Sequence, residues 1–138
     1  LMREMGDRQG AARALNNLGR LAHLQGDYAA AQALYEESLA LRREMGDKRG
    51  VAESLSGLAA VAGVGHGKAE LAARLAAAAH SLLELMGSKL DRTEQAVYDQ
   101  GVAAARRELD EDAFAAAWNE GQAMTLDEAV AYALERGI

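Results

Sequence analysis

The sequence contains no cysteine and no proline in its 138 residues, and only 4% of its residues are aromatic. Without cysteine, the chain has no disulfides and no thiol chemistry. Without proline, the strongest breaker of helix interiors is missing. Because aromatic residues are few, the core has to be built mostly from Leu, Ala, Val and Met, and this composition predicts helix nearly throughout.

Long apolar runs and an excess of positive charge are also absent. No hydrophobic stretch reaches the roughly 20 residues of a membrane span, and the N-terminus lacks the layout of a signal peptide. The formal net charge of −6 disfavours a surface for nucleic acid, which requires clustered Lys and Arg. The composition therefore predicts a cytoplasmic protein that binds neither nucleic acid nor membranes.

What the sequence does contain is an internal repeat. The pentapeptide "REMGD" occurs at residues 3–7 and again at residues 43–47, which is 40 residues later. The match continues beyond the pentapeptide, so that Leu18, for example, falls on Leu58. A fixed period of this length is typical of proteins built from stacked supersecondary units.

Short joints divide each repeat into halves. Gly-Asp recurs every 20 residues, at Gly6-Asp7, Gly26-Asp27 and Gly46-Asp47. Glycine suits the left-handed position just past the end of a helix, and aspartate suits the N-cap of the next helix. Two later joints, Gly67-Lys68 and Gly87-Ser88, are displaced by one residue, which we attribute to an insertion in "GVGHGK". Each joint is predicted to end one helix and begin another.

The segments between the joints have the periodicity of helices. Apolar and small residues recur at spacings of three and four, as on one face of an α-helix. These residues are Ala14, Leu15, Leu18, Leu21 and Ala22 in the first segment, and Ala31, Leu34, Tyr35, Ser38 and Leu39 in the second. Helices joined by short turns pack as antiparallel pairs, and tandem pairs stack to bury their faces. The predicted fold is all-α, a solenoid of antiparallel helix pairs.

The spacing of large and small residues resembles the tetratricopeptide repeat in its 40-residue form. The positions that carry this resemblance are Leu15, Leu18, Gly19, Ala22, Ala31, Tyr35 and Ser38. The second repeat departs from the pattern, because Ala59 replaces the glycine and Ala76 replaces the aromatic residue. The stretch "NNLGRLAHLQGDYAAAQALYEESLALRREMGD" is similar to the C-terminal sensor repeats of MalT-like STAND signalling ATPases and of LuxR-type transcriptional regulators.

This resemblance implies a function as well as a fold. It implies a non-catalytic scaffold that binds a protein or peptide partner, including other domains of its own full-length chain. It also implies that the chain is the C-terminal fragment of a sensor repeat array in a larger bacterial signalling or transcription-regulatory protein. The identity of the partner, the signal and the effector domain stays open.

The repeat register divides the chain into four parts. They are residues 1–6, the stump of a preceding repeat helix; residues 7–46, one repeat; residues 47–87, a second, degenerate repeat; and residues 88–138, a helical cap. Because the first "REMGD" lies so near the first residue, we expect the chain to be a piece of a longer array.

The cap is predicted to contain three helices, near residues 91–108, 111–122 and 126–136. Asp91 with Glu94, and Thr125 with Glu128, have the spacing of a capping box at the start of a helix. Phe114 and Trp118 are four residues apart and are expected to wedge the cap against the array. A cap is needed because the last helix pair of a solenoid has no neighbour to cover it.

No catalytic constellation or cofactor site is predicted. His23, His66 and His80 lie far apart and fit no metal-ligand spacing. "GVGHGK" lacks the Gly-Lys-Ser/Thr of a phosphate-binding loop, and is predicted to be an irregular turn. The sequence therefore predicts a protein that is not an enzyme and that holds no metal or cofactor.

The predicted binding surface is the concave face, which the first helix of each pair lines. The candidate partner-binding residues are Arg13, Asn16, Asn17, Arg20, His23, Glu53 and Ser56. Asn17 is the sharpest candidate, because a carboxamide offers both a donor and an acceptor to a peptide backbone. The alternative for Asn17 is a hydrogen bond within the neighbouring repeat. The second repeat has Gly57 at the matching position, so this clamp is not repeated.

Self-association is the alternative function. The Ala-rich segment "AELAARLAAAAHSLLELMG" has an apolar face that is wide for a helix buried on one side only. Its members are Leu71, Leu75, Ala79, Leu82, Leu83 and Met86. Such a face would pack against a second copy of the chain in a homodimer.

Overall fold

The computed structural model describes residues 2–136, which fold entirely into helices and the turns between them. The elements are α1 (Met2–Leu24), α2 (Tyr28–Glu44), α3 (Lys48–Ala60), the π-helical turn η1 (Val61–Gly65), α4 (Ala69–Met86), α5 (Arg92–Glu108), α6 (Glu111–Gln122) and α7 (Leu126–Arg136).

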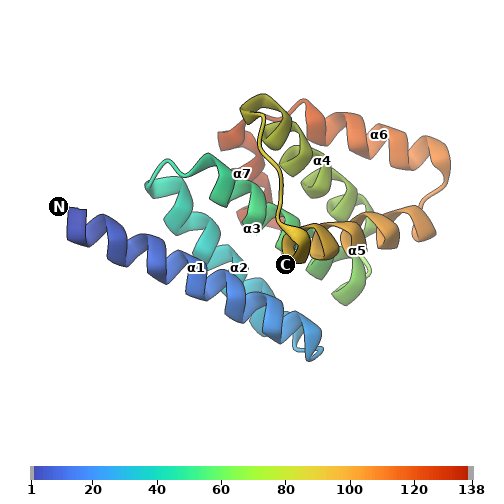
Figure 1. The fold of residues 1–138 in the computed structure, drawn as a ribbon. Helices are drawn as coiled ribbons and strands as arrows, with labels where there is room; N and C mark the ends of the chain where they lie inside the picture. The colour runs from blue at the N-terminus through green and yellow to red at the C-terminus, as the bar shows by residue number, and fades with distance from the viewer. Residues whose placement is uncertain (1, 137–138) are drawn as a thin grey trace.

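The helices stack as the repeat predicts. Figure 1 shows α1 antiparallel to α2, followed by α3 and α4 as a second pair, with α2 lying against α3. α6 packs on α4, while α7 returns to lie against α2, α3 and α4. α5 crosses the other side of α3 and η1. The predicted all-α fold of stacked helix pairs is confirmed.

The predicted joints are built as the sequence indicates at Gly26 and Gly46. Both glycines have positive φ angles, of 80° and 70°. The carboxylates of Asp27 and Asp47 then cap the next helices, accepting hydrogen bonds from the backbone N–H groups of Ala30 at 3.2 Å and of Gly50 at 2.9 Å. Each joint thus satisfies backbone groups that the helix ends would leave unpaired.

The structure differs from the prediction at Gly6-Asp7. α1 runs without a break from Met2 to Leu24, so residues 2–6 continue this helix and do not form a separate stump. The Gly-Asp pair alone therefore does not end a helix. At Gly46-Asp47, in contrast, Gly46 has a positive φ of 70°, and the helices on either side of it pack on each other.

The one-residue shift in the repeat has a structural counterpart. Residues Val61–Gly65 form a π-helical turn at the end of α3. In this turn the N–H of His66 donates to the carbonyl of Val61 at 3.0 Å, which is the i to i+5 pattern. A π-turn holds one more residue than an α-helical turn. The insertion predicted in "GVGHGK" therefore overlaps this turn.

The C-terminal helices lie where the sequence places them. α5, α6 and α7 begin and end within a residue of the predicted ranges. Asp91 and Glu94 form both hydrogen bonds of a capping box at the start of α5. At α7, the N–H of Thr125 donates to Glu128 at 2.9 Å, and the N–H of Glu128 donates to the Thr125 hydroxyl at 3.1 Å. The hydrogen bonds from the Thr125 backbone and hydroxyl lower the pKa of the Glu128 carboxyl.

Two aromatic residues join the cap to the array as predicted. Phe114 is buried and stacks on the half-buried Trp118, with ring centroids 5.7 Å apart. The guanidinium carbon of Arg106 lies 4.2 Å from the centre of the Phe114 ring, so α5 covers the same ring that α6 presents to α4. Gly121 lets α6 approach closely, because a Cβ there would lie 2.2 Å from the Arg74 carbonyl oxygen.

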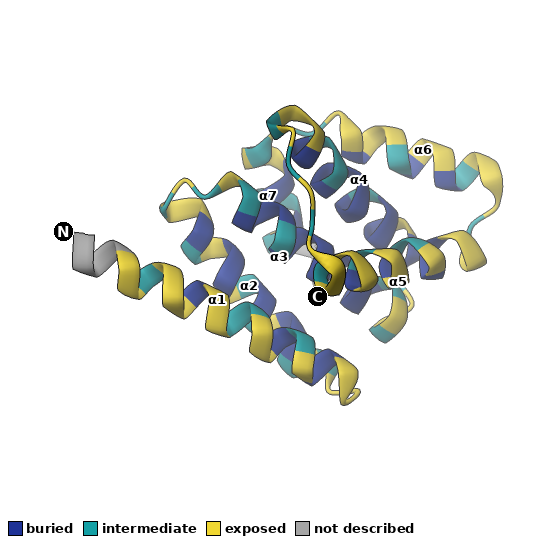
Figure 2. Ribbon diagram, in the orientation of Figure 1, coloured by how far each residue is buried: buried dark blue, intermediate teal, exposed yellow. Residues whose placement is uncertain are grey.

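The core is centred on α3 and α4. Figure 2 shows these two helices buried along most of their length, while α1 and α6 are exposed on their outer sides. The apolar face predicted for self-association lies inside this core, where Leu71, Leu75, Ala79, Leu82 and Leu83 are all buried. That face is wide because α4 has neighbours on several sides, among them α3, α5 and α6. It is therefore not available to a second copy.

Candidate functional site

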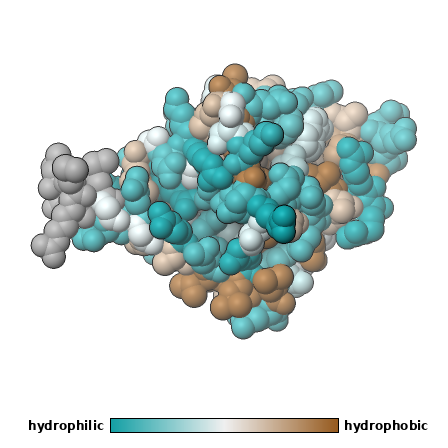
Figure 3. Space-filling model, in the orientation of Figure 1, coloured by the Kyte–Doolittle hydropathy of each residue, from teal (hydrophilic) through white to brown (hydrophobic). Residues whose placement is uncertain are grey.

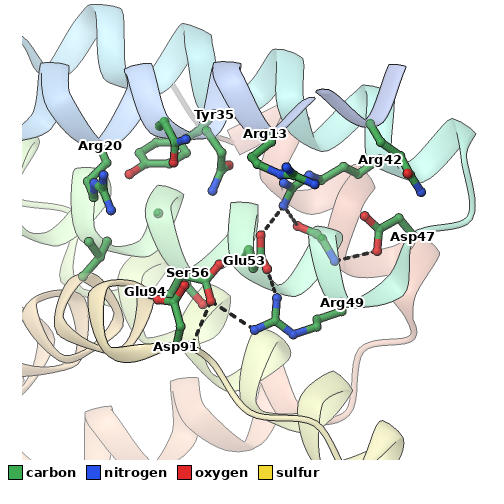
Figure 4. Close-up of a pocket in the computed structure, with 16 residues that line it drawn as sticks. Arg13, Arg20, Tyr35, Arg42, Asp47, Arg49, Glu53, Ser56, Asp91 and Glu94 are labelled. Carbon is green, nitrogen blue, oxygen red and sulfur yellow. Dashed lines mark hydrogen bonds and ion pairs between the residues drawn. The ribbon is translucent and has the colours of Figure 1, made fainter. Parts of the chain in front are cut away.

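A polar groove of about 430 Å³ lies between the first helix pair, α3 and the start of α5. α1 forms one wall, with Gln9, Arg13, Asn17 and Arg20. α3 contributes Glu53, Ser56 and Gly57, and α5 contributes the opposite wall with Asp91, Glu94 and Val97. Figure 4 shows the side chains of Arg13 and Arg20 directed from α1 towards this space.

The structure brings together all the predicted binding residues except one. Arg13, Asn16, Asn17, Arg20, Glu53 and Ser56 line the groove. They are 33 or more residues apart across the two repeats, from Arg20 to Glu53, and meet because α1 and α3 occupy equivalent places in successive pairs. His23 is the exception.

His23 is buried and belongs to a packing contact. Only 4% of its surface is exposed. Its Nε2 lies 3.0 Å from the side-chain oxygen of Gln100 on α5, and its ring packs edge-on against Tyr28 with centroids 5.4 Å apart. The sequence pattern placed His23 on the concave face correctly but could not show that α5 covers that face here. His23 is thus removed from the set of binding candidates.

α5 also shortens the concave surface over the second repeat. Gly101 of α5 lies so close to α3 that a Cβ there would be 3.0 Å from the backbone nitrogen of Ala60. Nothing in the 40-residue period signals this, because the repeat fades before α5 begins. The groove is consequently confined to the part of the array near α1.

The predicted residues differ in how free their side chains are. The Ser56 hydroxyl donates to the Ala52 carbonyl at 2.8 Å, and Asn16 accepts a hydrogen bond from the Ser54 hydroxyl at 3.0 Å. Arg13, Asn17 and Arg20, by contrast, form no hydrogen bond or ion pair with any residue that the structure describes. Arg13, Asn17 and Arg20 are therefore the side chains free to bind a ligand.

Glu53 is held in a network of ion pairs along the floor. One carboxylate oxygen lies 2.5 Å from Arg42, and the other contacts Arg49. Arg49 reaches on to Glu94 at 3.2 Å, so the network joins α2 and α3 to α5. Burial lowers the pKa of the Arg42 guanidinium, and the nearby Asp47 and Glu94 carboxylates oppose that shift. Glu53 is thus a structural residue of the groove, and its charge is already neutralised.

Sequence reasoning missed several residues of the groove. Arg42 and Tyr35 come from α2, which was expected to lie behind the concave face, and Asp91 and Glu94 were expected only to cap a helix. The glycines of the sequence offered one signal for Tyr35. A glycine occurs on each flanking helix beside its ring, at Gly19 of α1 and Gly57 of α3.

Tyr35 fits tightly between these two glycines. A Cβ at Gly19 would lie 3.2 Å from the Tyr35 ring, and a Cβ at Gly57 would lie 2.3 Å from it. Only 2% of the residue is exposed. Burial raises the pKa of Tyr35 to about 12, while the positive charge of Arg20 opposes this shift.

The tyrosine titration tests this burial directly. Because the phenol of an unfolded chain ionises near pH 10, a folded-state pKa of about 12 predicts stability that is complete below pH 10 and lost as the pH rises through 12. Absorbance at 295 nm should show late ionisation of Tyr35 and of Tyr98, whose pKa burial also raises to about 12. Tyr35→Phe should remove one late phenol and Tyr98→Phe the other. If the Tyr35→Phe variant instead lost a phenol that ionises near pH 10, the prediction would be contradicted.

The chain belongs to the tetratricopeptide-repeat family. The family model of the tetratricopeptide repeat matches residues 10–85, which is more than half of the 138 residues. The matched segment spans both helix pairs and therefore includes the α1 and α3 sides of the groove. Repeats of this family generally mediate protein–protein interactions, on a scaffold that is not itself catalytic.

Searches among curated proteins and among solved structures found no significant match. None of the described helices is both long and apolar enough to cross a membrane. Among the side chains that the structure describes, no three from acidic or histidine residues are grouped so that they could hold a metal ion.

Proposed function

We propose that this chain binds an extended segment of a protein or peptide partner in the groove between α1, α3 and α5. The observation that carries the proposal is the pair of unpaired cations on the α1 wall, Arg13 and Arg20, with Asn17 between them. Elsewhere in the groove, Glu53 and Glu94 contact Arg42 and Arg49, and the carboxylates of Asp47 and Asp91 cap the starts of α3 and α5. A ligand therefore gains most by meeting the α1 wall.

The spacing of these residues suggests the kind of segment that fits. Seven positions separate Arg13 from Arg20, which is about 10 Å along a helix axis. About three residues of extended chain cover the same distance. We infer that the ligand carries two carboxylates about three residues apart, with a backbone amide between them for Asn17. Arginine forms strong charge-assisted hydrogen bonds with such groups.

We also propose that the chain serves as part of a sensor repeat array in a larger bacterial signalling or transcription-regulatory protein. Binding in the groove would then report the presence of the partner to other domains. The ground for this context is the resemblance of residues 16–47 to such sensor repeats, as read from the sequence pattern. The coding sequence that flanks this chain tests it, because an adjoining nucleotide-binding or DNA-binding domain is expected.

A displayed library of random peptides tests the groove. Peptides recovered on the purified chain should be enriched in acidic residues about three positions apart. Arg13→Ala and Arg20→Ala should each weaken binding of such a peptide about tenfold or more, measured by fluorescence anisotropy, because each removes a charged hydrogen-bond donor. Asn17→Ala should also weaken binding without loss of helical circular dichroism.

The matched control is Arg107→Ala, which removes an exposed arginine at the end of α5 that lies outside the groove. It should leave peptide binding unchanged. Equal binding by the parent and by an Arg13→Ala/Arg20→Ala variant would refute the proposed site.

Self-association is a second candidate function, favoured by a different observation. Three leucines of α1, Leu18, Leu21 and Leu24, are about half or more exposed. Sedimentation over a range of concentrations separates the two functions. A monomer at all concentrations would exclude the dimer, while a dimer abolished by Leu21→Asp would support it.

A further inference from the structure

The groove has a second wall whose charge is opposite to that of α1. Asp91 and Glu94 line this side at the start of α5, and Figure 4 shows them across the groove from Arg13 and Arg20. Four arginines and four acidic residues line the groove in all, so its formal charge is zero. A ligand that carries only acidic groups would therefore meet favourable charge on one wall and unfavourable charge on the other.

Most of these charges already have a counter-ion inside the groove. Glu53 pairs with Arg42 at 2.5 Å and also contacts Arg49. Arg49 in turn pairs with Glu94 at 3.2 Å, and the Asp47 carboxylate interacts electrostatically with Arg42. On the acidic side of the groove, this leaves Asp91.

The Asp91 carboxylate is used as a helix cap, but its charge is not paired. One of its oxygens accepts a hydrogen bond from the backbone N–H of Glu94 at 2.8 Å. The other oxygen has no hydrogen bond, and the carboxylate forms no ion pair, with any residue that the structure describes. Asp91 is also exposed, so a ligand in the groove can reach it without displacing another side chain.

The surface around the groove is hydrophilic. Figure 3 shows that hydrophilic residues dominate the middle of the face on which α1 and the start of α5 lie, while apolar side chains gather at its lower edge. Val97 and Tyr35 line the groove but are only 7% and 2% exposed, so they offer a ligand little apolar area. Binding in the groove therefore depends chiefly on charged and polar groups.

An extended ligand presents side chains to both walls at once. An extended chain of the polyproline II type turns once in three residues and rises about 3.1 Å per residue. Two acidic residues three positions apart thus lie on one side of the ligand, about 9 Å apart, and both can face α1. The two residues between them point away from α1. A basic side chain there can form a charge-assisted hydrogen bond with Asp91 on α5.

We propose that the groove selects a segment of mixed charge, in which a basic residue that meets Asp91 stands between two acidic residues that meet Arg13 and Arg20. This inference rests on the proposed binding of an extended segment in the groove. Asp91 is then the residue that determines specificity, because its carboxylate attracts a basic side chain and repels an acidic one at the same place. The charges of such a segment complement the three unpaired residues one by one.

Three peptides that differ only between their two acidic residues test this selection. They carry Asp-Lys-Lys-Asp, Asp-Gln-Gln-Asp or Asp-Glu-Glu-Asp within the same neutral flanks, and fluorescence anisotropy measures their binding to the purified chain. The Lys peptide should bind about threefold more tightly than the Gln peptide, and the Glu peptide about threefold more weakly. These factors are modest because Asp91 is exposed to solvent.

Asp91→Asn removes the charge and keeps the cap, because asparagine caps a helix as well as aspartate does. The preference for the Lys peptide over the Gln peptide should disappear in this variant. The Glu peptide should bind the variant more tightly than it binds the parent, because a repulsive charge is gone. Circular dichroism at 222 nm should be unchanged.

The matched control is Asp110→Asn. Asp110 caps α6 by accepting a hydrogen bond from the N–H of Ala113 at 2.7 Å, and it lies outside the groove. The control changes the net charge of the chain by the same amount as Asp91→Asn does. It should leave the affinities of all three peptides unchanged.

Three results would overturn the selection by Asp91 while leaving the groove in place. They are a parent chain that does not prefer the Lys peptide, a preference that Asp91→Asn leaves intact, and a preference that Asp110→Asn reduces equally. Failure of all three peptides to bind would instead remove the groove itself, and the selection with it. A preference lost in Asp91→Asn and kept in Asp110→Asn would support the proposal.

Discussion

Replacing Tyr35 by alanine is expected to lower the free energy of unfolding by about 3–5 kcal/mol, the range for deleting a large buried aromatic side chain. Tyr35 is 2% exposed and fills the space between Gly19 of α1 and Gly57 of α3. Two glycines cannot move inward to close the cavity, since neither has a side chain to repack. Urea unfolding followed by circular dichroism at 222 nm measures the loss.

A double-mutant cycle with Gly57 separates packing from other causes. Gly57→Ala alone should destabilise the chain by about 1–3 kcal/mol, because its methyl group meets the Tyr35 ring. In the Tyr35→Ala background the ring is gone, and the same change should stabilise by about 0.5–1 kcal/mol through helix propensity.

Gly10→Ala is the matched control, because a Cβ at Gly10 meets nothing within 4 Å. This substitution should stabilise the chain in both backgrounds. Gly57→Ala effects of equal sign and size in the two backgrounds would show that Tyr35 does not occupy this space.

Replacing Glu53 by glutamine is expected to cost about 3 kcal/mol of stability, near the lower end for removing one partner of a buried ion pair. The side chains of Arg42 and Glu53 are 6% and 11% exposed, so Arg42 would keep a buried charge without its closest counter-ion. The cost is placed at the lower end because Asp47 and Glu94 also interact with Arg42.

The control for Glu53 is Glu44→Gln in the exposed pair of Arg8 and Glu44. The side chains of that pair are 43% and 66% exposed, and their N–O distance is 2.8 Å. An exposed pair of this kind contributes about 1 kcal/mol or less. The double variant Arg42→Met/Glu53→Leu should recover much of the stability lost in Glu53→Gln, because no unpaired charge stays buried. Equal small losses for Glu53→Gln and Glu44→Gln would mean that the Arg42–Glu53 pair is not buried.

Local rules of sequence were enough to place most helix ends. The positive φ of Gly26 and Gly46 and the caps formed by Asp27 and Asp47 depend on a few adjacent atoms. The capping boxes of α5 and α7 are equally local, and so is the π-turn that takes up the inserted residue. The Gly-Asp joints repeat in the sequence because the same short-range hydrogen bonds are needed at each of them.

The failures of sequence reasoning are all long-range. The break expected at Gly6-Asp7 is absent, and α1 runs through this pair without interruption. His23 was expected in the binding surface, but α5 covers it with Gln100, which lies 77 positions further along the chain. The apolar face of α4 was expected to be free, but α6 and α5 pack on it.

The sequence by itself determined the repeat, the helix pairs and the row of polar side chains on α1, because periodicity and capping act over a few residues. Only the tertiary structure decided that α5 closes the groove at the second repeat, that Glu53 is neutralised by Arg42 and Arg49, and that Leu18 and Leu21 are left exposed. These outcomes depend on which helices meet in space. α5 crosses α3 in close contact at Gly101. The repeat pattern of the sequence contains no signal for this contact.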